Sequence, residues 1–260
     1  MLKILKYSFY DLMRSRWSYV YFLFYLLLGC VLLFLNNDLS KAVITLMNVI
    51  IILVPLIGTI FGVIYYYSSR EFTELLLAQP VKRSSIFLGQ YFGVALSLSL
   101  SLIIGLGLPF VFYGIFKSAA IWDFSLLLIT GSFLTLIFTA LAFIIALANE
   151  NKIKGFSYAI LMWLFMAVIY DGLFLLSLIY FENYPLDKFS LIATMFNPID
   201  LSRVLILLKL DISALLGYTG AVFQKFFGTS LGLIISTGML LLWVLIPIGI
   251  IYRMVKRKDF

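Results

Sequence analysis

Histidine is absent from this chain of 260 residues, and Cys30 is its only cysteine. These two absences exclude a zinc site built on histidine and cysteine, an intrachain disulfide, and acid–base catalysis by histidine. Charge is also scarce: Asp, Glu, Lys and Arg make up only 12% of the residues, against about 25% in a soluble domain. A water-soluble globule with so few charges would expose large apolar patches, which excludes an ordinary cytosolic enzyme.

Apolar residues make up 63% of the chain, and the mean hydropathy is +1.11. Such a composition excludes a disordered protein and makes the bilayer the expected solvent, because about 20 apolar residues span a membrane as a helix. The apolar runs are continuous rather than alternating, which argues against a β-barrel. We therefore predict an all-α integral membrane protein, one transmembrane domain over residues 1–260 with six spans at roughly 17–36, 43–67, 91–116, 124–148, 157–180 and 231–252.

Positive charge is unevenly distributed between the segments that connect these spans. With the N-terminus inside, 13 Lys and Arg residues fall on the inner side and 6 on the outer side. Cytoplasmic loops carry the excess of Lys and Arg in membrane proteins. The bias predicts that both termini are cytoplasmic, and it explains the net charge of +7 without nucleic acid as a partner.

Residues 1–16 show helical spacing of apolar residues, with Leu2, Leu5, Phe9 and Leu12 on one face. The pattern predicts an interfacial amphipathic helix on the cytoplasmic leaflet. Such a helix would either anchor the first span or move with an attached cytoplasmic partner.

The first cytoplasmic loop, residues 68–90, predicts a short helix that ends before Pro80. Arg70 and Glu74 stand at the i,i+4 spacing that favours pairing on a helix. Three leucines follow at 75–77, and a solvated connection does not need three leucines in water. We expect a docking site for a soluble subunit here, whereas the shorter loop at 150–155 is expected to be a simple turn with basic residues.

The longest polar stretch, residues 181–230, lies outside the membrane by this topology. Asn197 and Pro198 have the types expected at a helix start, and Asp200 suits the positive end of that helix. Asp211 is placed to cap a second short helix, and Tyr218 falls in a turn between two glycines. These helices would lie on the lipid surface or form a platform for an extracytoplasmic partner.

Asp171 lies near the middle of the fifth predicted span. A charge at this depth costs roughly 2.5–3.5 kcal/mol on insertion scales, so the side chain should face protein or water. It would either accept hydrogen bonds from Tyr170 or a neighbouring span, or line a pathway or a moving interface. Met162 and Met166, one turn apart, are assigned to packing rather than to copper binding, and we predict no metal site.

The string R-E-F-T-E-L-L-L-A-Q-P-V-K-R, followed by I-F-L-G-Q, resembles the loop between the second and third spans of type-2 ABC transporter permeases. The layout of six spans with both termini inside is similar over the whole chain. In that family the loop forms a coupling helix that inserts into a cleft of the ATPase subunit. The resemblance implies the contact residues Arg70, Glu71, Glu74, Leu75, Leu76, Pro80 and Arg83.

Residues 196–223 further resemble the permease subunits of transporters that mature nitrous oxide reductase. Those permeases work with a cytoplasmic ATPase and a periplasmic, copper-handling partner. The resemblance therefore implies an extracytoplasmic partner, and the candidate contact residues are Asn197, Pro198, Asp200, Arg203, Asp211 and Tyr218.

No G-x-x-x-x-G-K-[ST] stretch is present in the sequence, so the chain is expected not to be an enzyme and to bind no cofactor of its own. ATP and Mg would be held by two copies of a separate ATPase beneath two copies of this chain in the bacterial inner membrane. Three alternatives stay open: an ABC exporter permease for lipid, drug or peptide; an ion-coupled secondary transporter using Asp171; and a scaffold that transports nothing.

Overall fold

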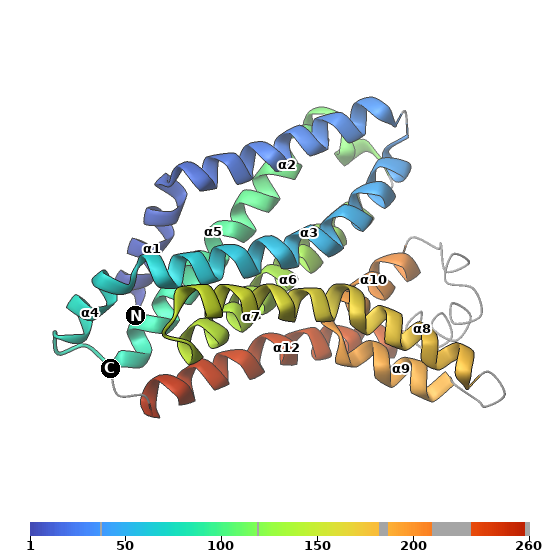
Figure 1. Ribbon diagram of the computed structural model, residues 1–260. Coiled ribbons are helices and arrows are strands. Elements are labelled where there is room, and N and C mark those ends of the chain that lie inside the picture. The colour runs from blue at the N-terminus through green and yellow to red at the C-terminus, as the bar shows by residue number, and fades with distance from the viewer. Residues whose placement is uncertain (37, 119, 182–186, 210–229, 258–260) are drawn as a thin grey trace.

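The computed structural model describes residues 1–36, 38–118, 120–181, 187–209 and 230–257. Within these ranges every regular element is a helix (Figure 1), as predicted. In chain order the elements are α1 (Leu2–Arg14), α2 (Arg16–Leu35), α3 (Leu39–Ser68), α4 (Arg70–Leu77), α5 (Arg83–Phe112), η1 (Ile115–Lys117), α6 (Ile121–Ala148), α7 (Lys152–Leu164), η2 (Phe165–Ile169), α8 (Tyr170–Tyr180), α9 (Asp187–Phe196), α10 (Pro198–Lys209) and α12 (Ser230–Arg257).

Six helices of the described chain are long and apolar enough to cross a membrane, which confirms the predicted fold class. The fifth is continuous from Lys152 to Tyr180 and includes α7, the π-helical turn η2 and α8. The third, α5, begins at Arg83 and ends at Phe112, whereas the sequence predicted 91–116. It ends early because Gly114 has a φ of 93°, which breaks the helical path.

The inner layer of the bundle consists of α3, α5 and α6. About 61% of the apolar window of α5 is buried, against 11% for the fifth span. Helices α3 and α6 approach closely at Gly62, where an added Cβ would lie 2.8 Å from the Cβ of Ala142. The small-residue spacing Gly58-x-x-x-Gly62 thus serves close helix packing.

The outer helices α2, α7–α8 and α12 expose many large apolar side chains. Phe34, Leu176 and Ile179 are 88%, 64% and 71% exposed. In water such a surface would be a strong aggregation liability, and in hydrocarbon it costs nothing. The exposure is what a multi-pass membrane protein requires.

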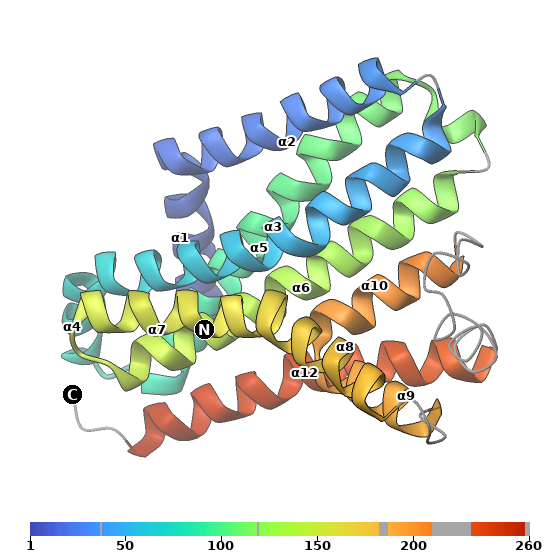
Figure 2. The same ribbon diagram turned by 45° about the vertical axis from the view of Figure 1, so that its right-hand side comes forward.

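The start of α1, the helix α4, the α6–α7 turn and the last turn of α12 gather at one end of the bundle, here called the α4 end (Figures 1 and 2). Helices α9 and α10 lie at the opposite end. Most described basic residues lie in or next to these elements or at the start of α5: Lys3, Lys6, Arg70, Lys82, Arg83, Lys152, Lys154, Arg253, Lys256 and Arg257, while Arg14 and Arg16 flank the junction of α1 and α2.

Helix α1 packs along the first turns of α5; its predicted place at the lipid surface stays a prediction. An added Cβ on Gly93 would lie 2.6 Å from the Cβ of Ser8, and one on Gly89 would lie 3.1 Å from the Cβ of Ile4. Gly89 and Gly93 therefore leave the space on α5 into which α1 packs, here called the seat of α1. Because α5 has 30 residues and a length of about 45 Å, it has room for this seat beyond the roughly 30 Å hydrocarbon core.

Candidate functional site

Helix α4 is short and strongly two-faced. Its inward face is held by a hydrogen bond that Gln90 Nε2 of α5 donates to Thr73 Oγ1 over 2.8 Å. Beside it, the ring of Phe72 stacks on the ring of Tyr7 from α1, with centroids 4.5 Å apart. These contacts join α4 to α5 and to α1, so movement of α4 is coupled to both helices.

The outward face of α4 carries Glu71, Glu74 and Leu75, all exposed. Leu75 is 68% exposed, whereas Leu76 and Leu77 are partly covered and pack against the apolar core. The predicted pair exists: Arg70 Nε donates to Glu74 Oε1 over 3.0 Å. Because both side chains are more than half exposed, the pair contributes at most about 1 kcal/mol, and its charges are available to a partner.

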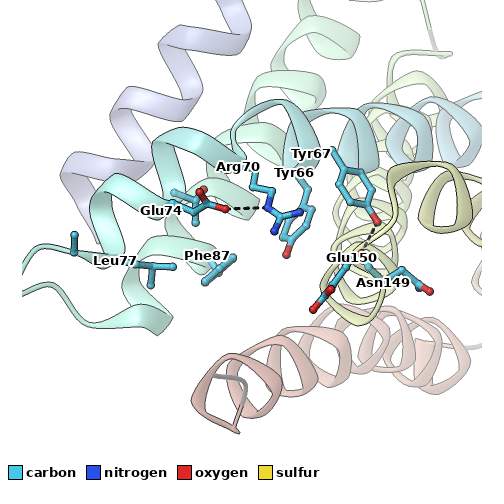
Figure 3. Close-up of a pocket in the computed structure, with 10 residues that line it drawn as sticks. Tyr66, Tyr67, Arg70, Glu74, Leu77, Phe87, Asn149 and Glu150 are labelled. Atoms are coloured by element: carbon cyan, nitrogen blue, oxygen red, sulfur yellow. Dashed lines mark hydrogen bonds and ion pairs between the residues drawn. The ribbon is translucent and has the colours of Figure 1, made fainter. Parts of the chain in front are cut away.

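A cleft of about 460 Å³ opens beside α4 (Figure 3). Tyr66, Arg70 and Glu74 line it from α3 and α4, and Asn149 and Glu150 line it from the α6–α7 turn. The structure thus brings the two predicted cytoplasmic loops to one site, although the second loop was expected to be a simple turn.

Tyr67 fastens the α6–α7 turn to the end of α3. Its hydroxyl donates to the carbonyl oxygen of Asn149 over 2.7 Å (Figure 3). A Cβ on Gly155 would collide with that hydroxyl, so the glycine leaves space for the tyrosine. The side chain of Asn151 accepts from the backbone N–H groups of Ile153 and Lys154 and caps α7.

A second polar cluster surrounds Asp171 in the fifth span. Arg203 Nη1 of α10 donates to Asp171 Oδ2 over 2.7 Å and to Asp200 Oδ1 over 3.2 Å. Asn197 Nδ2 donates to Asp200 Oδ2 and to the carbonyl oxygen of Met166, each over 2.8 Å. Among the described residues no group of three or more His, Cys, Asp or Glu side chains that could hold a metal is found.

Several predicted contact residues lie at the surface of the α4 end. The exposed ones are Arg70, Glu71, Glu74, Leu75, Pro80 and Arg83. Leu76 is half-buried against the core. Their contact with an ATPase stays a prediction.

The predicted extracytoplasmic contact residues divide differently. Asn197, Pro198 and Asp200 are buried, Asn197 donates to the carbonyl oxygen of Met166 in the fifth span, and Arg203 is only partly exposed. Asp211 and Tyr218 lie outside the described residues. Contact of this set with a partner stays a prediction, and in this conformation the first three are not at the surface.

Three residues that position α4 and the cleft were not predicted from the sequence: Tyr7, Tyr67 and Gln90. One signal was available for Tyr67, because a run of three tyrosines at 65–67 directly precedes the loop. Gln90 ends the I-F-L-G-Q segment of the resemblance, but its partner and that of Tyr7 could not be predicted from the sequence, since these partners lie 17 and 65 positions away in the chain.

The fold is that of a multi-pass helical membrane protein. At its α4 end, which is rich in basic residues, the outward face of α4 and the cleft beside it are exposed. No protein-family model matches the chain. Over 136 residues, or 50% of its length, it is 25% identical to the protein named "Probable ABC transporter permease protein NosY" from Stutzerimonas stutzeri. The match covers 49% of that relative, so the chain spans about half its length. The similarity supports an ABC transporter permease.

Proposed function

We propose that this chain is the membrane-spanning permease subunit of an ABC transporter and that a separate ATPase drives it from the α4 end. The outward face of α4 carries the proposal. Leu75 projects there beside two carboxylates, although an exposed leucine on an eight-residue helix stabilises nothing within the chain itself. An apolar pocket on a soluble partner would bury it.

The packing of α4 supports the transmission of force. Helix α4 directly follows α3, is hydrogen-bonded to α5 and stacks on α1. A push on its outer face therefore acts on two long spans at once, as in rigid-body switching. Two copies of the chain above two ATPase subunits would let nucleotide binding draw the two α4 helices together, with ATP and Mg held by the ATPases.

The finer assignment is maturation of nitrous oxide reductase, with an extracytoplasmic copper-handling protein as partner and the bacterial inner membrane as location, both termini being cytoplasmic. It rests on the resemblance of residues 196–223 and on the excess of basic residues at the α4 end. Helices α9 and α10 lie at the opposite end of the bundle, where such a partner would bind.

Ion coupling through Asp171 is the weaker alternative. Arg203 donates to Asp171 over 2.7 Å and to Asp200 over 3.2 Å, so one guanidinium offsets part of the charge of two carboxylates and reduces the attraction of Asp171 for a transported cation. An exporter of lipid, drug or peptide keeps the same coupling site and differs only in cargo.

The docking surface is tested by Leu75→Arg in a strain that expresses the chain with its ATPase. We expect the variant to insert and fold but to lose most of the co-purified ATPase, because arginine cannot enter an apolar pocket. The matched control is Phe116→Arg, since Phe116 is 69% exposed and lies on η1, which follows the end of α5 that is remote from α4. Unchanged co-purification with Leu75→Arg, or ATP hydrolysis by the purified chain alone, would contradict the proposal.

A further inference from the structure

Arg203 joins two helices that the sequence separates by a long connection. It lies on α10 and reaches Asp171 of α8 and Asp200 of its own helix. The side chains of Arg203, Asp171 and Asp200 are only 27%, 29% and 10% exposed. Charges so far from water attract each other more strongly than a surface pair does, and removal of one leaves its partner uncompensated.

Helices α9 and α10 form a bent pair with an angle of 115° between Phe189–Phe196 and Pro198–Leu207. Asn197 occupies the bend, and its side chain donates to the carbonyl oxygen of Met166. Met166 belongs to the π-helical turn η2, a local widening that alters the regular ladder of backbone hydrogen bonds. The bend between α9 and α10 therefore contacts the fifth span at its π-helical turn η2.

Two further hydrogen bonds hold α9 in this position. The hydroxyl of Tyr170, next to Asp171, donates to the carbonyl oxygen of Ala193 over 2.6 Å. On the other side, Trp243 Nε1 of α12 donates to the carbonyl oxygen of Met195 over 3.0 Å. Both bonds use backbone carbonyls, so they fix the position of α9 whatever its side chains are.

The fifth span connects this cluster directly to the cleft at the α4 end. It begins at Lys152, just after the turn that Tyr67 fastens to α3, and it runs without a break past Asp171. The 19 residues between them span about 28 Å. A single helix thus reaches from the cleft beside α4 to the bent pair, and the pair contacts it at the π-helical turn.

We propose that Arg203 is a positioning residue: its bridge to Asp171, called here the Asp171–Arg203 latch, holds the α9–α10 pair to the fifth span so that movement of that span is passed to the outer end of the molecule. Both residues of the latch belong to this chain, so the latch forms without a partner. Its role in transmission rests on the proposed function.

The latch is tested by the accessibility of a buried position on α9. Thr194 is 3% exposed, and Thr194→Cys in a Cys30→Ser background gives a single reporter thiol for a small water-soluble methanethiosulfonate. We expect Asp171→Asn and Arg203→Ala to raise the labelling rate at least tenfold. The exchange Asp171→Arg with Arg203→Asp keeps two carboxylates and one guanidinium, so it should restore slow labelling, as should Arg203→Lys in part.

Lys41→Ala is the matched control, because Lys41 is an exposed cation on α3 and its loss should leave the rate unchanged. Equal rates in the parent, Asp171→Asn and Arg203→Ala would overturn the latch. If the single variants fail to fold while the exchanged pair folds and labels slowly, the latch is supported.

Transmission is tested in the complex with the ATPase trapped by ATP and vanadate. A second reporter, Gln79→Cys, lies exposed beside α4. In the parent both reporters should change their labelling rate on trapping, and with Arg203→Ala only Gln79→Cys should change. No change at Gln79→Cys would contradict the proposed function, whereas a change there without one at Thr194→Cys in the parent would overturn the transmission role alone.

Discussion

Single glycines decide how closely α1 approaches α5. At Gly93 an added Cβ would lie 2.6 Å from the Cβ of Ser8 and 3.0 Å from the carbonyl oxygen of Leu5. At Gly107, on the same helix, an added Cβ would meet no other atom within 4 Å. The two glycines are chemically identical, and only the first is required by packing.

We therefore expect Gly93→Ala to destabilise the folded protein by about 1–3 kcal/mol through overpacking against α1. Gly107→Ala should raise the stability by up to about 1 kcal/mol, because alanine is the better helix former and its Cβ meets no other atom there. Thermal unfolding in detergent measures both variants. Equal stability of the two would show that α1 does not rest on Gly93.

Tyr67 gives a second prediction at this scale. Tyr67→Phe removes the hydroxyl that donates to Asn149, at a cost of about 1 kcal/mol. The α6–α7 turn should then open more often, and hydrogen exchange at residues 149–155 should become faster. Tyr158→Phe, a change on the exposed surface of α7, is the control and should leave exchange there unaltered.

At the scale of elements, local patterns predicted the local structure. The i,i+4 spacing predicted the Arg70–Glu74 pair, and Asn197 before Pro198 predicted the start of α10, where Asn197 Oδ1 accepts from the N–H of Ile199. Both features depend on neighbours in the chain, so helical geometry alone specifies them.

Contacts between different helices could not be predicted from the sequence. Asp171 was expected either to accept from Tyr170 or a neighbouring span, or to line a pathway or a moving interface; its described donor is Arg203 of another helix, α10, and Tyr170 donates to Ala193. The helices at 181–230 were expected either on the lipid surface or as a platform for an extracytoplasmic partner, and the bend between α9 and α10 turns Asn197 inward. The helical period of 3.6 residues predicts which residues share one face of a helix. It does not predict the angle between two helices.

For the whole molecule, the placement of charge predicts which end lies in the cytoplasm. In the Cys30→Ser background, Gln79→Cys should react with an impermeant thiol reagent only in inside-out vesicles. Lys117→Cys, on η1 at the other end, should react only in right-side-out vesicles. The excess of Lys and Arg at the α4 end is the physical reason. Reaction of Gln79→Cys from the outside would reverse the topology and remove the ATPase from α4.

The separation of Asp171 from Arg203 by 32 positions has a consequence for biogenesis. A ribosome adds about 5–20 residues per second, so Asp171 leaves it roughly 2–6 s before its cation does. During that interval the nascent fifth span carries a lone carboxylate into the translocon, with no guanidinium to neutralise it. On insertion scales this lone carboxylate costs roughly 2.5–3.5 kcal/mol near the bilayer centre, and the cost is offset when α10 brings Arg203 beside it.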